Sequence, residues 1–199
     1  DIVNESMVCD GPEKVWRQSV DFYKDGKCMM QEKFENKIAI YPGSFDPITN
    51  RHVDIIKRGS RIFDEIIVLV AYNPNKSFLF SVEERCQFIR EIFQDCKGIR
   101  VDFHDGLLID YLKHSGASTI LRGMRALSDF EYEFQMALIN RRQTKNVETV
   151  FLMSGFRWFY TSSKLIKEVA SLGGSVRGLV PENVHQKLME KFNIKNNGK

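Results

Sequence analysis

The first organised segment of the chain reads IAIYPGSFDPITNRH, from Ile38 to His52. Its first four residues predict a buried strand, and a helix is expected from about His52 to Phe63, after a turn that contains Pro and Gly. A strand, a short loop and a helix form the repeating unit of an alternating α/β fold. We therefore expect the folded domain to begin at Lys37.

The rest of the domain continues this alternation. Ile66 to Ala71 is the clearest strand, a run rich in β-branched residues, and further strands are predicted at 99–103, 119–121 and 147–153. Helices are expected at 82–96, 107–114, 129–142, 162–172 and 181–192. The pattern predicts a doubly wound, Rossmann-like α/β fold with one parallel five-stranded sheet and helices on both faces. Such sheets bind ligands beyond the carboxyl ends of their strands.

Two local signals mark helix ends. The run Ser81-Val82-Glu83-Glu84 is a capping-box pattern, in which the Ser81 hydroxyl accepts the Glu84 amide proton and the Glu84 carboxylate reaches back. Gly116 follows the helix predicted at 107–114 and is expected to end it in a left-handed conformation.

Residues 1–36 differ from the rest of the chain. They are polar and irregular and show no strand signal, although the apolar residues between Val15 and Tyr23 would suit a short amphipathic helix. The chain begins with Asp1, and Met29 and Met30 stand just before the organised region. We therefore expect 1–36 to be an N-terminal extension, either non-native or an accessory arm, and 37–199 to be the functional domain.

The composition is that of an ordinary globular protein. Of 199 residues, 43% are hydrophobic and 28% are charged, and the formal net charge is +3. Acidic and basic residues are interspersed, which argues against a nucleic-acid partner, and no apolar run reaches the length of a membrane span. The four cysteines lack metal-ligand spacing, so we expect free thiols, a cytoplasmic location and no metal site built from the protein alone.

The loop from Tyr41 to His52 has features of a phosphate site. A glycine-containing loop before a helix N-terminus presents free amide protons and the positive end of the helix dipole. His52 would project from the first helical turn, and its protonated imidazole could donate a hydrogen bond to a phosphoryl oxygen. The alternative is an ordinary turn, with Thr49 or Asn50 as the N-cap and His52 solvated, and the spacing alone does not decide between the two.

Further loops follow other predicted strands. The arginines of Arg122-Gly123-Met124-Arg125 could bind separate phosphate groups, or could pair with the acids of 129–133. The hydroxyls and aromatic rings of 158–164 would suit a phosphate and an adenine, although a plain Ser N-cap explains the same residues. Lys76 is either a further contributor or a solvated side chain. Motifs of P-loop kinases, of dinucleotide-binding oxidoreductases and of Ser-His-Asp hydrolases are absent from the sequence.

Taken together, these motifs resemble the phosphopantetheine adenylyltransferase family of the nucleotidyltransferase superfamily. The resemblance covers about Lys37 to Phe192 and rests on YPGSFDPITNRH, RGMRALSDFEYE, SSKLIKEVA and LVPENVH. It implies transfer of the adenylyl group of ATP to 4′-phosphopantetheine by direct in-line displacement, giving dephospho-coenzyme A and pyrophosphate. It also implies Mg²⁺ as cofactor, a homohexamer, and coenzyme A as a feedback inhibitor.

The resemblance implies roles for residues that match the family position by position. His52 matches the histidine that stabilises the transition state at the α-phosphate, and the other catalytic candidates are Arg125, Lys76 and Ser163. The acceptor site is implied at Ser44, Lys76, Leu108 and Arg122. The ATP site is implied at Ser44, Phe45, His52, Gly123, Met124, Arg125, Glu133, Trp158, Phe159, Tyr160, Thr161, Ser162, Ser163 and Lys164.

Three positions depart from the family pattern. Arg51 stands in place of a Gly, Thr161 in place of an Ile, and Lys164 in place of a Ser. We expect Arg51 either to swing outward or to add a cation near the triphosphate, and Lys164 to offer a charged donor to the β- or γ-phosphate. Two alternatives stay open: a nucleotidyltransferase with another acceptor, such as nicotinamide mononucleotide, and a catalytically silent nucleotide-binding relative.

Overall fold

The computed structural model describes residues 23–24, 27–28, 37–72, 76–125, 127–144 and 146–193. The chain divides into two units, residues 1–35 and 36–199. In the first unit, β1 (Tyr23–Lys24) pairs antiparallel with β2 (Lys27–Cys28). This pair corrects the prediction that 1–36 contains no strand, because strands of two residues carry no side-chain periodicity to detect. Of the helix predicted between Val15 and Tyr23, residues 15–22 lie outside the described residues.

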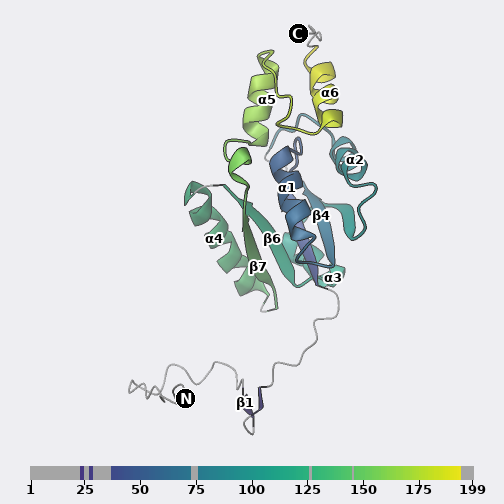
Figure 1. Cartoon of the computed structure of the whole chain (residues 1–199). Coiled ribbons are helices and arrows are strands. Elements are labelled where there is room, and N and C mark those ends of the chain that lie inside the picture. The colour runs from purple at the N-terminus through teal and green to yellow at the C-terminus, as the bar shows by residue number, and fades with distance from the viewer. Residues whose placement is uncertain are drawn as a thin grey trace, which may run out of the picture. The chain divides into compact units, whose positions relative to one another are not determined.

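The second unit is built on a parallel sheet with the strand order β5-β4-β3-β6-β7 (Figure 1). Its strands are β3 (Ile38–Gly43), β4 (Glu65–Ala71), β5 (Ile99–His104), β6 (Thr119–Met124) and β7 (Glu148–Met153). The chain adds β4 and β5 on one side of β3, then crosses over and adds β6 and β7 on the other. The predicted fold with five parallel strands is confirmed. The order reverses between β3 and β6, which is where such sheets bind ligands.

Helices cover both faces of this sheet, because successive strand residues point to opposite sides. Ala39 and Val68 belong to a buried cluster formed with α1 (Asn50–Gly59), α2 (Val82–Ile92), α5 (Ser163–Ser171) and α6 (Glu182–Lys191). Their neighbours Ile40 and Ile67 belong to a second cluster with α3 (Leu108–Ser115). A long helix, α4 (Leu127–Gln143), contacts β6 and β7. None of the helices in the described part is long and apolar enough to cross a membrane.

The local signals at helix ends act as predicted. The Ser81 amide donates to the Glu84 carboxylate at 2.8 Å, and the Glu84 amide donates to Ser81 Oγ at 3.2 Å. Gly116 ends α3 in the left-handed region, with a φ of 73°.

Two helices end earlier than predicted. α1 ends at Gly59 rather than Phe63, and α2 ends at Ile92 rather than Cys96. Phe63 and Phe93 continue the apolar periodicity of these helices. They lie in the turns that follow the helices, and their side chains are still buried.

Candidate active site

The predicted site residues lie at one edge of the sheet. Ser44 and Phe45 directly follow β3, Lys76 follows β4, and Arg125 follows β6. The segment with the 3-10 turn η1 (Phe156–Trp158) follows β7 and leads into α5. Since the strands are parallel, their carboxyl ends share this edge, next to the reversal of strand order. The loops therefore converge although they are far apart in the sequence.

His52 lies in the first turn of α1 and is mostly buried, so the solvated alternative is wrong. Thr49 caps the helix, and the imidazole takes the part of the capping-box partner. His52 Nδ1 lies 3.1 Å from the Thr49 amide nitrogen and 3.0 Å from Thr49 Oγ1. The Phe45 ring packs edge-on against the imidazole, with 5.2 Å between ring centroids. Because Nδ1 faces the cap, Nε2 is the ring nitrogen left for a ligand.

Burial, and then the charges of Arg51, Arg122 and Arg125, hold the pKa of His52 well below its ordinary value. This shift favours the neutral ring in the ligand-free site, whereas the sequence predicted a ring that is protonated when it faces a phosphoryl group. A neutral imidazole still donates one hydrogen bond, and an anion bound beside it would raise its pKa again. The three guanidinium groups lie close enough to act on His52, as a shared phosphate site requires.

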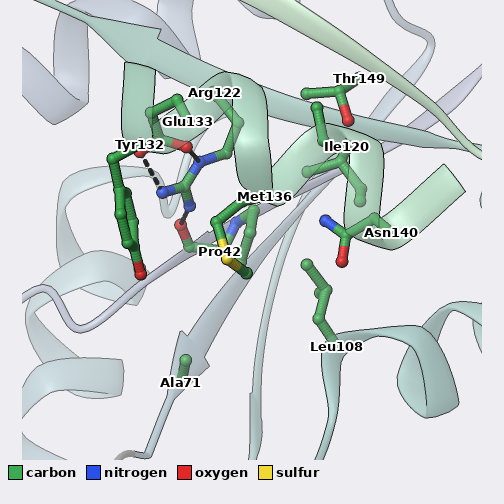
Figure 2. A pocket seen from close by; sticks show the side chains of 12 residues that line it. Pro42, Ala71, Leu108, Ile120, Arg122, Tyr132, Glu133, Met136, Asn140 and Thr149 are labelled. Atoms are coloured by element: carbon green, nitrogen blue, oxygen red, sulfur yellow. Dashed lines mark hydrogen bonds and ion pairs between the residues drawn. The ribbon is translucent and has the colours of Figure 1, made fainter. Parts of the chain in front are cut away.

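Carboxylates of α4 hold two of these arginines. Arg122 Nε donates to Glu133 at 2.7 Å, and its Nη1 donates to the Pro42 carbonyl at 2.9 Å (Figure 2). Arg125 binds Asp129 with its fork, through Nε at 2.9 Å and Nη2 at 3.0 Å. The predicted pairing with the acids of 129–133 is thus confirmed. The pairs also fix both arginines at the edge of the site, where phosphate groups can reach them.

The end of β3 and the loop after it contribute to the lining of two cavities. The first, which we call the α4 cavity, has a volume of about 190 Å³ and includes Pro42, Gly43, Leu108, Arg122, Met136, Asn140 and Thr149 in its lining. In Figure 2, Arg122 lies toward one end of this cavity, Asn140 and Thr149 lie toward the other, and Met136 lies between them. The second, the lysine cavity, measures about 420 Å³ and is lined by Ser44, Asp46, Lys76, Ser77, Phe78, Ser163, Lys164 and Lys167. Gly43 and Ser44 are adjacent in the chain but line different cavities.

The lysine cavity is built on a buried carboxylate. Asp46 is 3% exposed and accepts hydrogen bonds from the amides of Leu79 and Phe80, at 3.1 and 3.0 Å. Lys167 Nζ lies 2.6 Å from the same carboxylate. These contacts tie the β3 loop both to the segment before α2 and to α5. The buried charge is thereby paired, as buried charges in proteins usually are.

The start of α5 forms another wall of the lysine cavity. Ser162 is the N-cap, and its hydroxyl accepts the Leu165 amide proton at 3.1 Å, so the Ser N-cap interpretation is confirmed. Ser163 donates its hydroxyl proton to the Pro47 carbonyl at 2.8 Å. Ser163 and Lys164 nevertheless line the cavity, so the positive end of the helix faces it. The capping and phosphate-binding interpretations are compatible.

The residues predicted for the acceptor site do not all lie together. Leu108 and Arg122 line the α4 cavity, whereas Ser44 and Lys76 line the lysine cavity. The strands that precede or contain these residues are neighbours in the sheet, but the two pairs line different cavities.

The residues predicted for ATP binding are also dispersed. Phe45 is buried between Tyr41 and His52, and Thr161 is buried as well. Gly123 lies where a Cβ would approach Ile55 to 2.9 Å, so its first effect is to let α1 pack on β6. Met124 ends β6, where its carbonyl accepts a hydrogen bond from the Ser154 hydroxyl.

The aromatic residues after β7 are accessible. The Tyr160 side chain is 81% exposed, and its ring meets that of Phe159 edge-on, with 5.0 Å between centroids. Trp158 ends η1 and is partly buried, with the Arg157 guanidinium 5.0 Å above its ring. Exposed rings at this edge are free to stack on a planar ligand.

Several cavity residues were not identified from the sequence. Lys167 lies three residues after Lys164, one turn along the same helix, and that spacing could have linked the two. Asn140 is a polar residue in an apolar stretch of α4 and is only 8% exposed, which is a weak sign of function. Thr149 in β7 carries no local signal. The fold alone brings Asn140 and Thr149 together in the α4 cavity, and it places Lys167 in the lysine cavity.

Arg51 points inward, so the expectation that it swings outward is wrong. Its Nη2 atom lies 3.3 Å from His52 Nε2, beside the group expected to meet the reacting phosphate. Arg51 is therefore part of the site rather than a surface residue.

The protein offers few ligands for a metal ion. Among the described residues, no group of three or more His, Cys, Asp or Glu side chains is arranged to hold one. The Asp46 carboxylate reaches the lysine cavity, but both of its oxygens already accept hydrogen bonds. Mg²⁺ is commonly bound through substrate phosphates together with one or two carboxylates, and Asp46 is the carboxylate in the lining of the lysine cavity.

Comparison with known proteins identifies the family. The cytidylyltransferase-like family matches residues 40–169. The phosphopantetheine adenylyltransferase of Syntrophus aciditrophicus is 63% identical over 82% of this chain and 99% of its own length. Those of Desulfosudis oleivorans and Dictyoglomus thermophilum are 58% and 52% identical, over 78% and 80% of this chain and 93% and 98% of their own lengths. With its fold and its cationic edge, the chain belongs to the phosphopantetheine adenylyltransferase family, within the cytidylyltransferase-like group.

Proposed function

We infer that this chain transfers the adenylyl group of ATP to 4′-phosphopantetheine and releases pyrophosphate. The observation that carries this inference is the pair of unlike cavities lined by the adjacent residues Gly43 and Ser44. A narrow and largely apolar cavity with an arginine suits a flexible acceptor that bears a phosphate. A wider cavity with three lysines suits a triphosphate. The relatives' name, phosphopantetheine adenylyltransferase, contains the same acceptor and the same transferred group.

The reaction follows from placing one substrate in each cavity. An oxygen of the acceptor phosphate attacks the α-phosphorus of ATP, the bond from that phosphorus to the oxygen bridging to the β-phosphate breaks, and pyrophosphate leaves. No covalent enzyme intermediate is needed, because the protein contributes positioning and charge stabilisation. His52 would donate from Nε2 to an α-phosphate oxygen as charge builds there, and Arg125 would neutralise the same group.

The lysine cavity would hold the leaving group. Lys76, Lys164 and Lys167 surround it, and the first amides of α5 and the Ser163 hydroxyl add neutral donors. Mg²⁺ would enter with the triphosphate and neutralise part of its charge. The exposed rings of Phe159 and Tyr160 would lie against the adenine.

The α4 cavity would hold the acceptor. Arg122 would bind its phosphate while Glu133 keeps the guanidinium in place. Leu108 and Met136 would contact the methylene groups, and Asn140 and Thr149 would hydrogen-bond the amides of the pantetheine arm.

Two further properties are part of the proposal. α4 exposes Phe130, Phe134, Leu138 and Ile139, and the first two rings stack at 5.5 Å; such an apolar surface supports the homohexamer that we propose. Light scattering should then give six times the chain mass, and Phe134→Arg should lower it. Coenzyme A combines a pantetheine arm with an adenine nucleotide, so we propose that it inhibits by occupying both cavities.

We place the enzyme in the cytoplasm, where the free thiols of Cys86 and Cys96 would be stable.

The test is a pyrophosphate-release assay with ATP, Mg²⁺ and 4′-phosphopantetheine, with mass spectrometry of the product. Dephospho-coenzyme A is the expected product, and coenzyme A should slow its formation. Release with nicotinamide mononucleotide instead would establish the other acceptor. ATP binding without any release would establish the catalytically silent relative and contradict the proposal.

A further inference from the structure

Arg51 differs from the other two arginines near His52. Arg122 is held by Glu133 and Arg125 by Asp129, but no described carboxylate lies within ion-pair distance of Arg51. Among the described residues, Arg51 Nε is also the one buried side-chain nitrogen or oxygen without a hydrogen-bond partner. Leaving a buried charged donor unsatisfied is costly, and such groups call for an explanation such as a ligand.

The contact between Arg51 and His52 is also unsatisfied. The Thr49 amide donates to His52 Nδ1, so the neutral ring carries its proton on Nε2. Arg51 Nη2 can only donate, and it lies 3.3 Å from that same Nε2, so two donors face each other. In the other tautomer, Nδ1 would donate to Thr49 Oγ1 and Nε2 would accept from Arg51, but the Thr49 amide would then lose its acceptor. Neither tautomer satisfies both contacts.

An anionic oxygen placed between the two donors would remove this conflict. It would accept one hydrogen bond from His52 Nε2 and one from Arg51 Nη2, and it would supply the negative charge that Arg51 lacks. A neutral oxygen could accept the two hydrogen bonds but would leave the charge of Arg51 without a counterion. The donor pair and the charge together favour an anion.

We propose that Arg51 is a second donor, beside His52, to the phosphate group that reacts in this site. The proposal rests on the proposed function for the identity of that phosphate, but the donor pair would bind a polyphosphate in any case. It gives a role to the position where the chain departs from the family pattern. Arg51 would hold the reacting phosphate with a fixed charge while the neutral His52 ring supplies a directional hydrogen bond.

The first experiment measures binding without turnover, with α,β-methylene-ATP as the probe. Arg51→Ala should weaken its affinity about tenfold, the scale of one charge-assisted hydrogen bond, and Arg51→Lys should weaken it less. In wild-type protein, the probe should also move the ¹⁵N resonance of His52 Nε2, and this shift should shrink in Arg51→Ala. A packing role alone would not move that resonance. Arg61→Ala is the matched control, since it removes the same charge from an exposed residue just beyond α1.

The second experiment measures turnover with ATP and 4′-phosphopantetheine. Arg51→Ala should lower kcat/KM about tenfold or more, and Arg61→Ala should leave it unchanged. Equal or faster turnover together with unchanged probe affinity in Arg51→Ala would overturn the proposal, since Arg51 would then only obstruct the site. If the alanine variant does not fold, Arg51→Gln, which keeps most of the volume but not the charge, should give the same losses. Inactive wild-type protein that still shows the Arg51-dependent shift of His52 would refute the proposed function but not the donor pair.

Discussion

The α4 cavity and the lysine cavity are lined by residues adjacent in the chain, Gly43 and Ser44, but their walls differ in polarity and charge. In the α4 cavity, apolar side chains form most of the wall, and the charge of Arg122 is held by Glu133. In the lysine cavity, Lys76 and Lys164 are exposed, and among the described residues Lys167 is the one lysine of this lining with an ion pair, to Asp46. The first can select its ligand by shape and by one oriented cation, whereas the second attracts any polyphosphate. Selectivity for the acceptor should therefore reside on the α4 side.

The largest effect is expected at His52, in the first turn of α1. His52→Ala should cut kcat about a hundredfold or more, the scale of losing one transition-state donor, and should change ATP affinity much less. Steady-state kinetics would show the split. His114→Ala, at an exposed histidine of α3, is the control, and thermal melting would check that the helix cap survives. An unchanged kcat would contradict the assigned role.

Substitutions in the α4 cavity should have a smaller effect, which raises the KM for the acceptor more than the KM for ATP. The double variant Arg122→Met, Glu133→Gln removes the ion pair without leaving a buried charge, and it should raise the KM for 4′-phosphopantetheine about tenfold or more. Glu133→Gln alone should change it less, because the arginine remains. The comparison would break down if the KM for ATP rose by as much as that for the acceptor.

The lysine cavity should show a weaker effect that depends on salt. Lys164→Ser should raise the KM for ATP about threefold to tenfold at low ionic strength, and the difference should shrink as salt screens the exposed charge. The KM for the acceptor should stay constant. Lys57→Ser, at an exposed lysine of α1, is the matched control. A loss that does not vary with salt would point to a structural role.

The smallest expected effect is on the way the free energy of unfolding varies with pH. Burial and the neighbouring arginines lower the pKa of His52 in the folded protein. As the pH falls through about 6.5, His52 therefore becomes protonated in the unfolded chain but not yet in the folded protein. Stability should therefore be fully present above pH 6.5 and should fall as the pH drops toward the lower pKa of the folded protein. Urea denaturation at several pH values would measure this slope. His52→Gln should flatten it, and a slope of the opposite sign would show that the folded site favours the charged ring.

The sequence predicted most of the fold because the signals are local. The β-branched run of β4 and the Ser81 capping box each act within a few residues, and both appear as predicted. The ends of helices were predicted less accurately than their presence. The apolar periodicity extends past Gly59 to Phe63, and it does not distinguish a longer helix from a buried turn.

The site was only partly predictable from the sequence. Arg122 and Arg125 could be singled out because they follow the strand predicted at 119–121, and His52 because it begins the helix predicted after the first strand. The division between the cavities could not be predicted, because Ser44 and Leu108 follow different strands and only the packing decides which cavity each one lines. Asn140 and Thr149 meet only after α4 packs beside β7.

The sequence by itself determined the alternation of strands and helices from Ile38 onward and the parallel sheet, since these follow from periodicity and from hydrogen bonds between near neighbours. The tertiary structure decided which loops share a cavity, that Arg51 turns inward, and that His52 is neutral. The physical reason is that burial and electrostatic interactions act through space, between groups that can be separated by seventy residues or more along the chain, as His52 and Arg125 are.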